Sequence, residues 1–289
     1  MTGDLRLWSG TVFGAGSADR IAAAVAGGFS SISLFPVDCA AALAEGRTAA
    51  DLRAMATDAG ITIATLDPYA RWVPDWRPPV GVDVSFLEQG EQDFLDAATA
   101  LGVESVSVIE GLGVRYPVDR LTEAFAAFCD TAAQRGLLVH LEFMPFSGVP
   151  DLATGWTIVR DAGRANGGLV LDLWHYLRGA RDDDLLRSVP GDRIFVVQVS
   201  DADAAVVGSL LEDSMQRRRL PGTASFDTAG VLELVHRIGA TRSIGAEVFS
   251  DDLRAVGPVE AARRAGEALR RVLARVPAAG TTPPGAGRP

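Results

Sequence analysis

Four polar residues occupy matching places in four successive short apolar segments between residues 137 and 249. They are Glu142 in HLEF, Asp172 in VLDLWH, Gln198 in VVQVSD and Glu247 in GAEVFS. Burying an unpaired carboxylate among apolar neighbours is costly, so these side chains need partners. If the fold brings the three carboxylates together, their repulsion protonates at least one of them unless a divalent cation balances the charge. The all-oxygen ligand set favours Mn²⁺ or Mg²⁺ over Zn²⁺.

Two interpretations of these four residues remain open. They are either separate buried groups, each satisfied by the backbone or by an arginine, or joint ligands of one metal ion. Their repetition at the same place in successive segments favours the metal ion. The only histidines are His140, His175 and His236, so a zinc site made of several histidines is difficult to build.

A cationic group follows in the segment RRRLPG. Arg219 directly precedes Leu-Pro-Gly, a rigid turn that is able to aim a guanidinium group at a substrate oxygen. The alternative is a solvated basic segment, which is the usual fate of three consecutive arginines.

Apolar segments typical of β-strands alternate with helical segments along the whole chain. Eight strands are predicted at 5–8, 31–35, 61–66, 105–109, 137–143, 169–173, 194–199 and 244–249. Eight helices are predicted at 17–26, 49–59, 86–101, 121–134, 155–164, 182–187, 228–238 and 258–276. Long loops are predicted at 67–84 and 200–226.

This alternation predicts an α/β fold, a single (β/α)₈ TIM barrel over residues 1–277, followed by a flexible Pro/Gly-rich tail at 278–289. The alternative is a doubly wound open sheet, which usually carries three glycines after its first strand. Gly14 and Gly16 occur there, but the third glycine is missing. In a barrel the catalytic groups come from the C-terminal ends of the strands, where the four polar residues are predicted to lie.

The composition excludes several classes of function. The 289 residues carry a net charge of −10 and include no lysine, which excludes Schiff-base catalysis and a lysine-dependent phosphate loop. The negative charge repels nucleic acid, and no apolar run reaches the roughly 18 residues of a membrane span. With no signal-peptide pattern and two widely separated cysteines, we expect a cytoplasmic protein that acts on a small molecule.

Five motifs together resemble a known family: EFMPFSG, GLVLDLWHYLRG, IFVVQVSDA, RRRLPG and AEVFS. The chain is similar, over most of residues 1–275, to the xylose-isomerase-like TIM-barrel superfamily, in its sugar phosphate isomerase/epimerase branch. The resemblance implies a divalent metal held by Glu142, Asp172, Gln198 and Glu247. It also implies that Glu142 and Glu247 form the acid/base pair and that His175 and Arg219 bind substrate oxygens.

The resemblance implies a metal-dependent isomerase or epimerase acting on a small polyhydroxylated carbonyl compound, a sugar or a cyclitol. The reaction is expected to remove a proton next to the metal-bound carbonyl and to pass through an enediolate. The alternative is a lyase on the same metal site, which dehydrates its substrate or cleaves a C-glycosidic bond. A binding subunit on a degenerate barrel is a third interpretation, and a homodimer is expected by analogy with such barrels.

Two positions separate this chain from individual branches of the superfamily. Many epimerases have histidine where this chain has Gln198. The 3-dehydroshikimate dehydratases resemble it in carrying glutamine there, but rely on a histidine where this chain has Met144. Asp67 and Glu110, at the ends of the third and fourth strands, are further candidates for contact with substrate.

Overall fold

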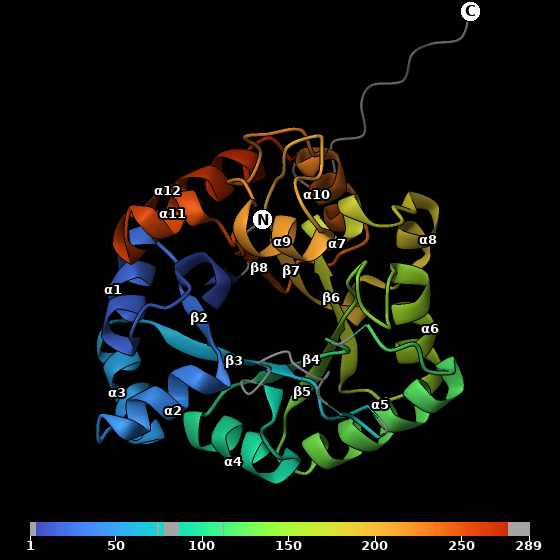
Figure 1. Cartoon of the computed structure of the whole chain (residues 1–289), viewed down its shortest axis with the longest axis horizontal. Helices are drawn as coiled ribbons and strands as arrows, with labels where there is room; N and C mark the ends of the chain where they lie inside the picture. The colour runs from blue at the N-terminus through green and yellow to red at the C-terminus, as the bar shows by residue number, and fades with distance from the viewer. Residues whose placement is uncertain (1–3, 74, 78–86, 112, 277–289) are drawn as a thin grey trace, which may run out of the picture.

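Eight parallel strands close into a barrel that is surrounded by helices (Figure 1). The computed structural model describes residues 4–73, 75–77, 87–111 and 113–276. The strands are β1 (Asp4–Leu7), β2 (Ser31–Leu34), β3 (Thr62–Tyr69), β4 (Ser105–Ile109), β5 (Leu138–Glu142), β6 (Gly167–Asp172), β7 (Ile194–Val199) and β8 (Ser243–Ala246). Each strand pairs with the next, and β8 pairs with β1. The prediction of a single (β/α)₈ barrel is confirmed.

Long helices follow the strands and pack their apolar faces against the barrel wall. They are α1 (Ser17–Gly27), α3 (Ala49–Asp58), α4 (Glu91–Leu101), α5 (Val118–Ala133), α6 (Leu152–Ala162), α10 (Thr228–Arg237) and α12 (Pro258–Leu273). The short helix α8 (Asp183–Ser188) follows β6, close to its predicted range. No helix in the described part of the chain is long and apolar enough to cross a membrane.

Four further helices lie in connections where the sequence analysis predicted none. They are α2 (Pro36–Ala44), α7 (Leu173–Arg178), α9 (Leu210–Gln216) and α11 (Asp251–Ala255). Helix α7 begins directly after β6 because the Asp172 carboxylate accepts hydrogen bonds from the backbone N–H groups of Trp174 and His175. The first turn of α7 therefore stays at the rim of the barrel.

Six strand ends differ from the prediction, and β1, β2 and β5 each end one residue earlier than predicted. Strand β3 continues to Tyr69, so the loop predicted at 67–84 starts later than expected. Strands β6 and β8 end at Asp172 and Ala246, before the predicted ends at residues 173 and 249. The tail predicted at 278–289 and much of the loop predicted at 67–84 lie outside the described residues.

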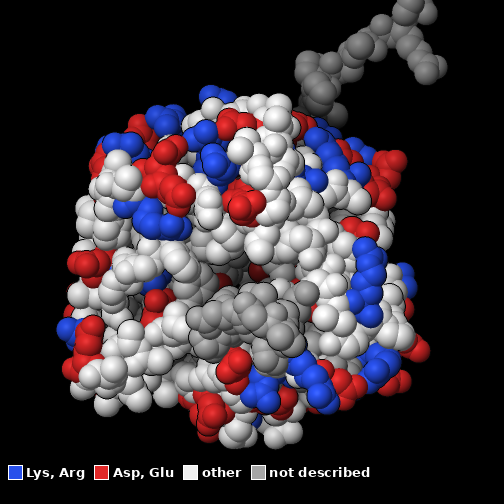
Figure 2. Space-filling model, in the orientation of Figure 1, with Lys and Arg blue, Asp and Glu red and all other residues white. Residues whose placement is uncertain are grey.

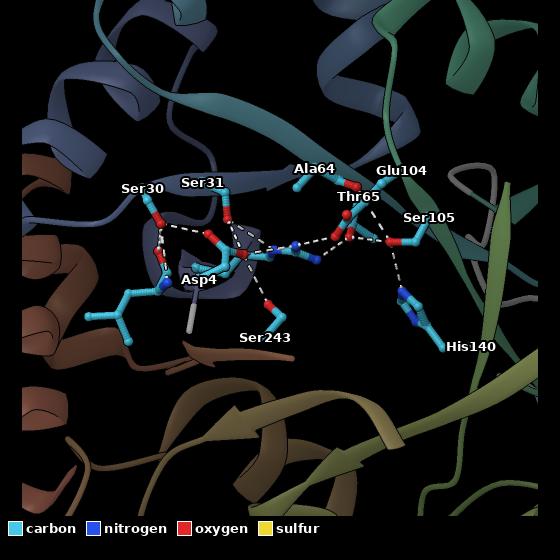
Figure 3. Close-up of polar contacts among 11 residues, drawn as sticks. Asp4, Ser30, Ser31, Ala64, Thr65, Glu104, Ser105, His140 and Ser243 are labelled. Carbon is cyan, nitrogen blue, oxygen red and sulfur yellow. Dashed lines mark hydrogen bonds and ion pairs between the residues drawn. The ribbon is translucent and has the colours of Figure 1, made fainter. Parts of the chain in front are cut away.

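A polar network around Arg6 of β1 fills the N-terminal end of the barrel interior. Figure 3 shows its members Asp4, Thr65, Ser105 and His140. The Arg6 guanidinium group donates hydrogen bonds to Asp4, Ser31, Thr65 and Glu104. The hydroxyls of Thr65 and Ser105 lie 2.9 Å apart, and Ser105 contacts Nε2 of His140 at 3.2 Å. Burial lowers the pKa of His140 to about 3, so this histidine is neutral and packs inside the N-terminal end of the barrel.

Strand register brings the predicted site residues to the same end of the barrel. Asp172 on β6 lies directly opposite Gln198 on β7, and Gln198 lies opposite Gly245 on β8, two residues before Glu247. On the other side, Glu142 is the last residue of β5 and pairs with Val170 of β6. The four predicted ligands thus lie along one arc of the C-terminal rim.

Candidate active site

The site begins with two carboxylates and a histidine from neighbouring elements. Nε2 of His175, in the first turn of α7, lies 3.3 Å from Oε1 of Glu142 and 3.9 Å from Oδ2 of Asp172. These three residues each offer a ligand atom, and the three atoms lie within 4.8 Å of one another. Since Asp172 caps α7, the same carboxylate that faces this cluster also fixes the position of His175.

Arg218 completes this cluster, although the sequence analysis did not select it. Its side chain is fully buried, and Nη1 donates to Oδ2 of Asp172 at 2.6 Å and lies 3.5 Å from Oε2 of Glu247. The Nη2 group lies 3.4 Å from Nε2 of His175 and donates to the hydroxyl of Ser214. One guanidinium group therefore joins the carboxylates of β6 and β8.

Arg219, which the sequence analysis expected at the substrate, lies elsewhere. Its guanidinium group forms ion pairs at the surface with Asp203 and Asp252. The backbone explains the difference, because Arg219 is bridged to Asp201 in an extended antiparallel pairing, where consecutive side chains point to opposite sides. Within the RRRLPG motif, the arginine that faces the cluster is Arg218.

The charges of this cluster shift the pKa values of its members in opposite directions. Burial opposes ionisation of Asp172, but the Arg218 and His175 charges outweigh it and hold its pKa below the usual value. Burial raises the pKa of Glu247 well above its usual value, and the charges of Glu142 and Asp172 raise it further, against the effect of Arg218. The neighbouring protein groups alone therefore do not compensate a negative charge on Glu247.

The residues present fit a divalent cation. The side-chain oxygen of Gln198 is buried and has no hydrogen-bond partner among the described residues. When ionised, the carboxylates of Glu142, Asp172 and Glu247 exceed the charge of Arg218 by two negative charges, which one divalent cation would balance. The interpretation of four separate satisfied groups fits Asp172, which is paired with Arg218, but not Gln198, whose oxygen has no partner among the described residues. Because His175 adds a nitrogen beside two carboxylates, the donor set also admits zinc.

The other candidates from the sequence have defined surroundings. Glu110 accepts hydrogen bonds from the backbone N–H groups of Gly113 and Val114, so it orders the loop after β4. Asp67 is buried near the end of β3, and its Oδ1 has no hydrogen-bond partner among the described residues. Met144 is buried in a small apolar cluster beside the site.

Figure 2 shows this face of the barrel hollowed near its axis, with acidic atoms inside the hollow.

Fold and site together define a class of protein: a (β/α)₈ barrel with a cluster of carboxylates, an amide and a histidine at the C-terminal ends of β5 to β8. The family model described as "Xylose isomerase-like TIM barrel" matches residues 21–273. The chain belongs to this family.

Its relatives are enzymes of two reaction types. A 3-dehydroshikimate dehydratase of Pseudomonas aeruginosa is 30% identical over 258 residues, which make up 88% of this chain but 39% of that protein. An inosose isomerase of Bacillus subtilis is 27% identical over 160 residues, 55% of each chain. A crystal structure of the IolI protein with a bound zinc atom superposes with a TM-score of 0.81, at 19% identity, over 94% of this chain and 99% of that one. This chain spans about two fifths of the length of the dehydratase.

Proposed function

We propose that the protein is a divalent-metal-dependent isomerase or epimerase of a small polyhydroxylated carbonyl compound, a sugar or a cyclitol. The observation that carries this proposal is the gathering of Glu142, Asp172 and Glu247 around Arg218 and His175, beside the unpartnered oxygen of Gln198. Glu142, Asp172, Gln198 and Glu247 would hold the cation. The net charge of −10 disfavours nucleic acid as a partner, which supports a small-molecule substrate.

A bound divalent cation would polarise the substrate carbonyl and reduce the cost of negative charge on its oxygen. Glu142 and Glu247 would then accept and donate the protons that are transferred. They come from β5 and the end of β8, three strands apart, so they reach a substrate over the barrel axis from different sides. One carboxylate takes the proton from the carbon next to the carbonyl, and the other returns a proton to the opposite face.

His175 and Arg218 would orient the groups that react. The His175 ring is fixed through the Asp172 cap, and its Nε2 faces the Glu142 carboxylate. Arg218 is held by the carbonyl and hydroxyl groups of Ser214, so its guanidinium group enters the site in one orientation. Both side chains present N–H groups to which substrate oxygens can bind.

A lyase is the second candidate function, because the dehydratase is similar to 88% of this chain. The first step would be the same removal of a proton, after which a leaving group departs from the neighbouring carbon. The resemblance implies that the dehydratase branch relies on a histidine at the position of Met144, which is apolar and buried in this chain. This difference supports the isomerase over the dehydratase.

Turnover in deuterated water separates the two candidates. We expect the protein, supplied with Mn²⁺, to exchange a hydrogen next to the carbonyl of an inosose or a ketose without loss of water, as followed by NMR. Loss of water from 3-dehydroshikimate, with the appearance of aromatic ultraviolet absorption, would instead support the lyase. Absence of both reactions across the panel, with and without Mn²⁺, would contradict the proposed function.

A further inference from the structure

Helices α7 and α9 lie side by side at the C-terminal rim and are joined by two buried ion pairs (Figure 1). The first belongs to the candidate site, where Asp172 at the start of α7 accepts a hydrogen bond from Arg218, two residues after α9. The second lies at the other end of α7, where Nη2 of Arg178 donates to Oδ2 of Asp213 on α9 at 2.9 Å. The two pairs therefore hold the α9 segment at both ends of α7.

The second pair also binds the connection that leads into α9. The Arg178 guanidinium group donates to the backbone carbonyls of Asp203 and Ala204, and Asp213 accepts a hydrogen bond from the backbone N–H of Val207. The side chains of Arg178 and Asp213 are only 7% and 4% exposed. Separating such a pair is costly, because each charge would be left buried without its partner.

Apolar burial does not explain how the α9 segment is held. Within residues 203–217, all of which the structure describes, Asp213 and Ser214 are the only buried residues. The apolar side chains of Val207 and Leu211 are 47% and 53% exposed. Helix α9 has seven residues, which is too short for a helix to be stable by itself in water. The position of the segment therefore rests mainly on its polar contacts with α7.

Ser214 connects this polar anchor to the candidate site. It directly follows Asp213, and its carbonyl and hydroxyl oxygens accept hydrogen bonds from Nε and Nη2 of Arg218 at 2.9 and 3.0 Å. The guanidinium groups of Arg178 and Arg218 also lie 5.6 and 5.4 Å from the ring centroid of Trp174 on α7. A shift of α9 against α7 would therefore move Arg218 within the site.

We propose that Arg178 and Asp213 are positioning residues, whose ion pair fixes α9 on α7 and thereby holds the Arg218 guanidinium group in the site. Their hydrogen bonds among the described residues go to each other and to the connection before α9, so they act through Arg218. The inference rests on the proposed function, since that function assigns Arg218 to the binding of a substrate oxygen.

The Nε–H proton of Arg218 reports on this positioning without substrate or metal. It is buried and bonded to Ser214, so it should exchange slowly with water in ¹H–¹⁵N NMR spectra of the metal-free chain, where its loss in Arg218→Lys identifies it. We expect Arg178→Met to speed this exchange by about tenfold or more, and Arg178→Lys, which keeps the charge, by less than about threefold.

The Nε–H proton of Arg6 is the internal control for the stability of the whole barrel, because it donates to Ser31 at the N-terminal end. Its exchange rate in Arg178→Met should stay within about threefold of wild type. Wild-type exchange of the Arg218 proton in Arg178→Met, or equal acceleration at Arg6 and Arg218, would overturn the inference.

Asp213→Asn is a milder variant that tests the same pair if Arg178→Met does not fold. It should speed exchange of the Arg218 proton by about threefold or more. Asp203→Asn is its matched control, because Asp203 belongs to the same segment but its carboxylate pairs with Arg219 at the surface. This control should leave the exchange unchanged, and equal acceleration by the two asparagine variants would contradict the proposal.

Steady-state kinetics separate positioning from a merely structural role. We expect Arg178→Met to raise KM by about tenfold and to keep kcat within about threefold, because a displaced Arg218 binds the substrate less well in the ground and transition states alike. A purely structural ion pair would leave KM unchanged, and that result would overturn the inference. The expected exchange rates without turnover by the wild-type chain would support the positioning and contradict the proposed function.

Discussion

Glu142→Gln and Glu247→Gln are each expected to lower kcat/KM by about 10²–10⁴-fold, the usual contribution of a general acid or base. Glutamine has nearly the same shape as glutamate but cannot accept or deliver the proton. The two carboxylates come from β5 and from the end of β8, so neither is placed to replace the other. The measurement is the rate of hydrogen exchange next to the substrate carbonyl in deuterated water.

The fold must survive for this loss to be informative. Both variants should keep a cooperative thermal transition, since each replacement removes one charge from a cluster of three carboxylates. Glu233→Gln is a suitable control, because Glu233 lies on the outer helix α10 and pairs with Arg237 there. Wild-type turnover by either site variant would refute the acid/base assignment.

Replacing Arg218 with methionine should destabilise the metal-free protein by about 3–5 kcal/mol, the cost of breaking a buried ion pair by removal of one partner. The change leaves the Asp172 and Glu247 carboxylates without their shared cation. Adding Mn²⁺ should restore part of the stability, because a ligand that binds only the folded state stabilises it. Urea unfolding with chelator and then with Mn²⁺ measures both effects.

Arg219→Ala provides the comparison within the same motif. Arg219 is partly exposed and pairs with Asp203 and Asp252 at the surface, and such pairs contribute about 0–1 kcal/mol. If Arg219→Ala proves as destabilising as Arg218→Met, or if Arg218→Met unfolds like wild type, the position assigned to Arg218 is wrong.

Much of the fold follows from local pattern alone. Strands and helices alternate with glycine stops between them, and a closed parallel barrel is the arrangement that accommodates eight such units. The positions of Glu142, Asp172 and Gln198 at the strand ends follow from the same pattern, because each interrupts an apolar run at its C-terminal end.

The remaining features depend on contacts that the sequence does not show. Which of Arg218 and Arg219 faces the site is set by an isolated β-bridge between Arg219 and Asp201. This bridge lies in an irregular connection, where no alternation of apolar residues shows which side faces inward. The Oδ1 atom of Asp67 has no hydrogen-bond partner in the described part of the chain, and this depends on which side chains of other strands come near it. Short helices such as α7 depend on a single cap.

Titration of Mn²⁺ into chelator-treated protein tests the central claim, that the C-terminal rim holds a divalent cation on Glu142, Asp172, Gln198 and Glu247. Calorimetry should show one ion bound per chain, and Gln198→Leu, which removes the unpartnered oxygen, should weaken binding by about tenfold or more. Failure of the wild-type chain to bind Mn²⁺ or Zn²⁺, with a melting temperature indifferent to both ions, would contradict the account.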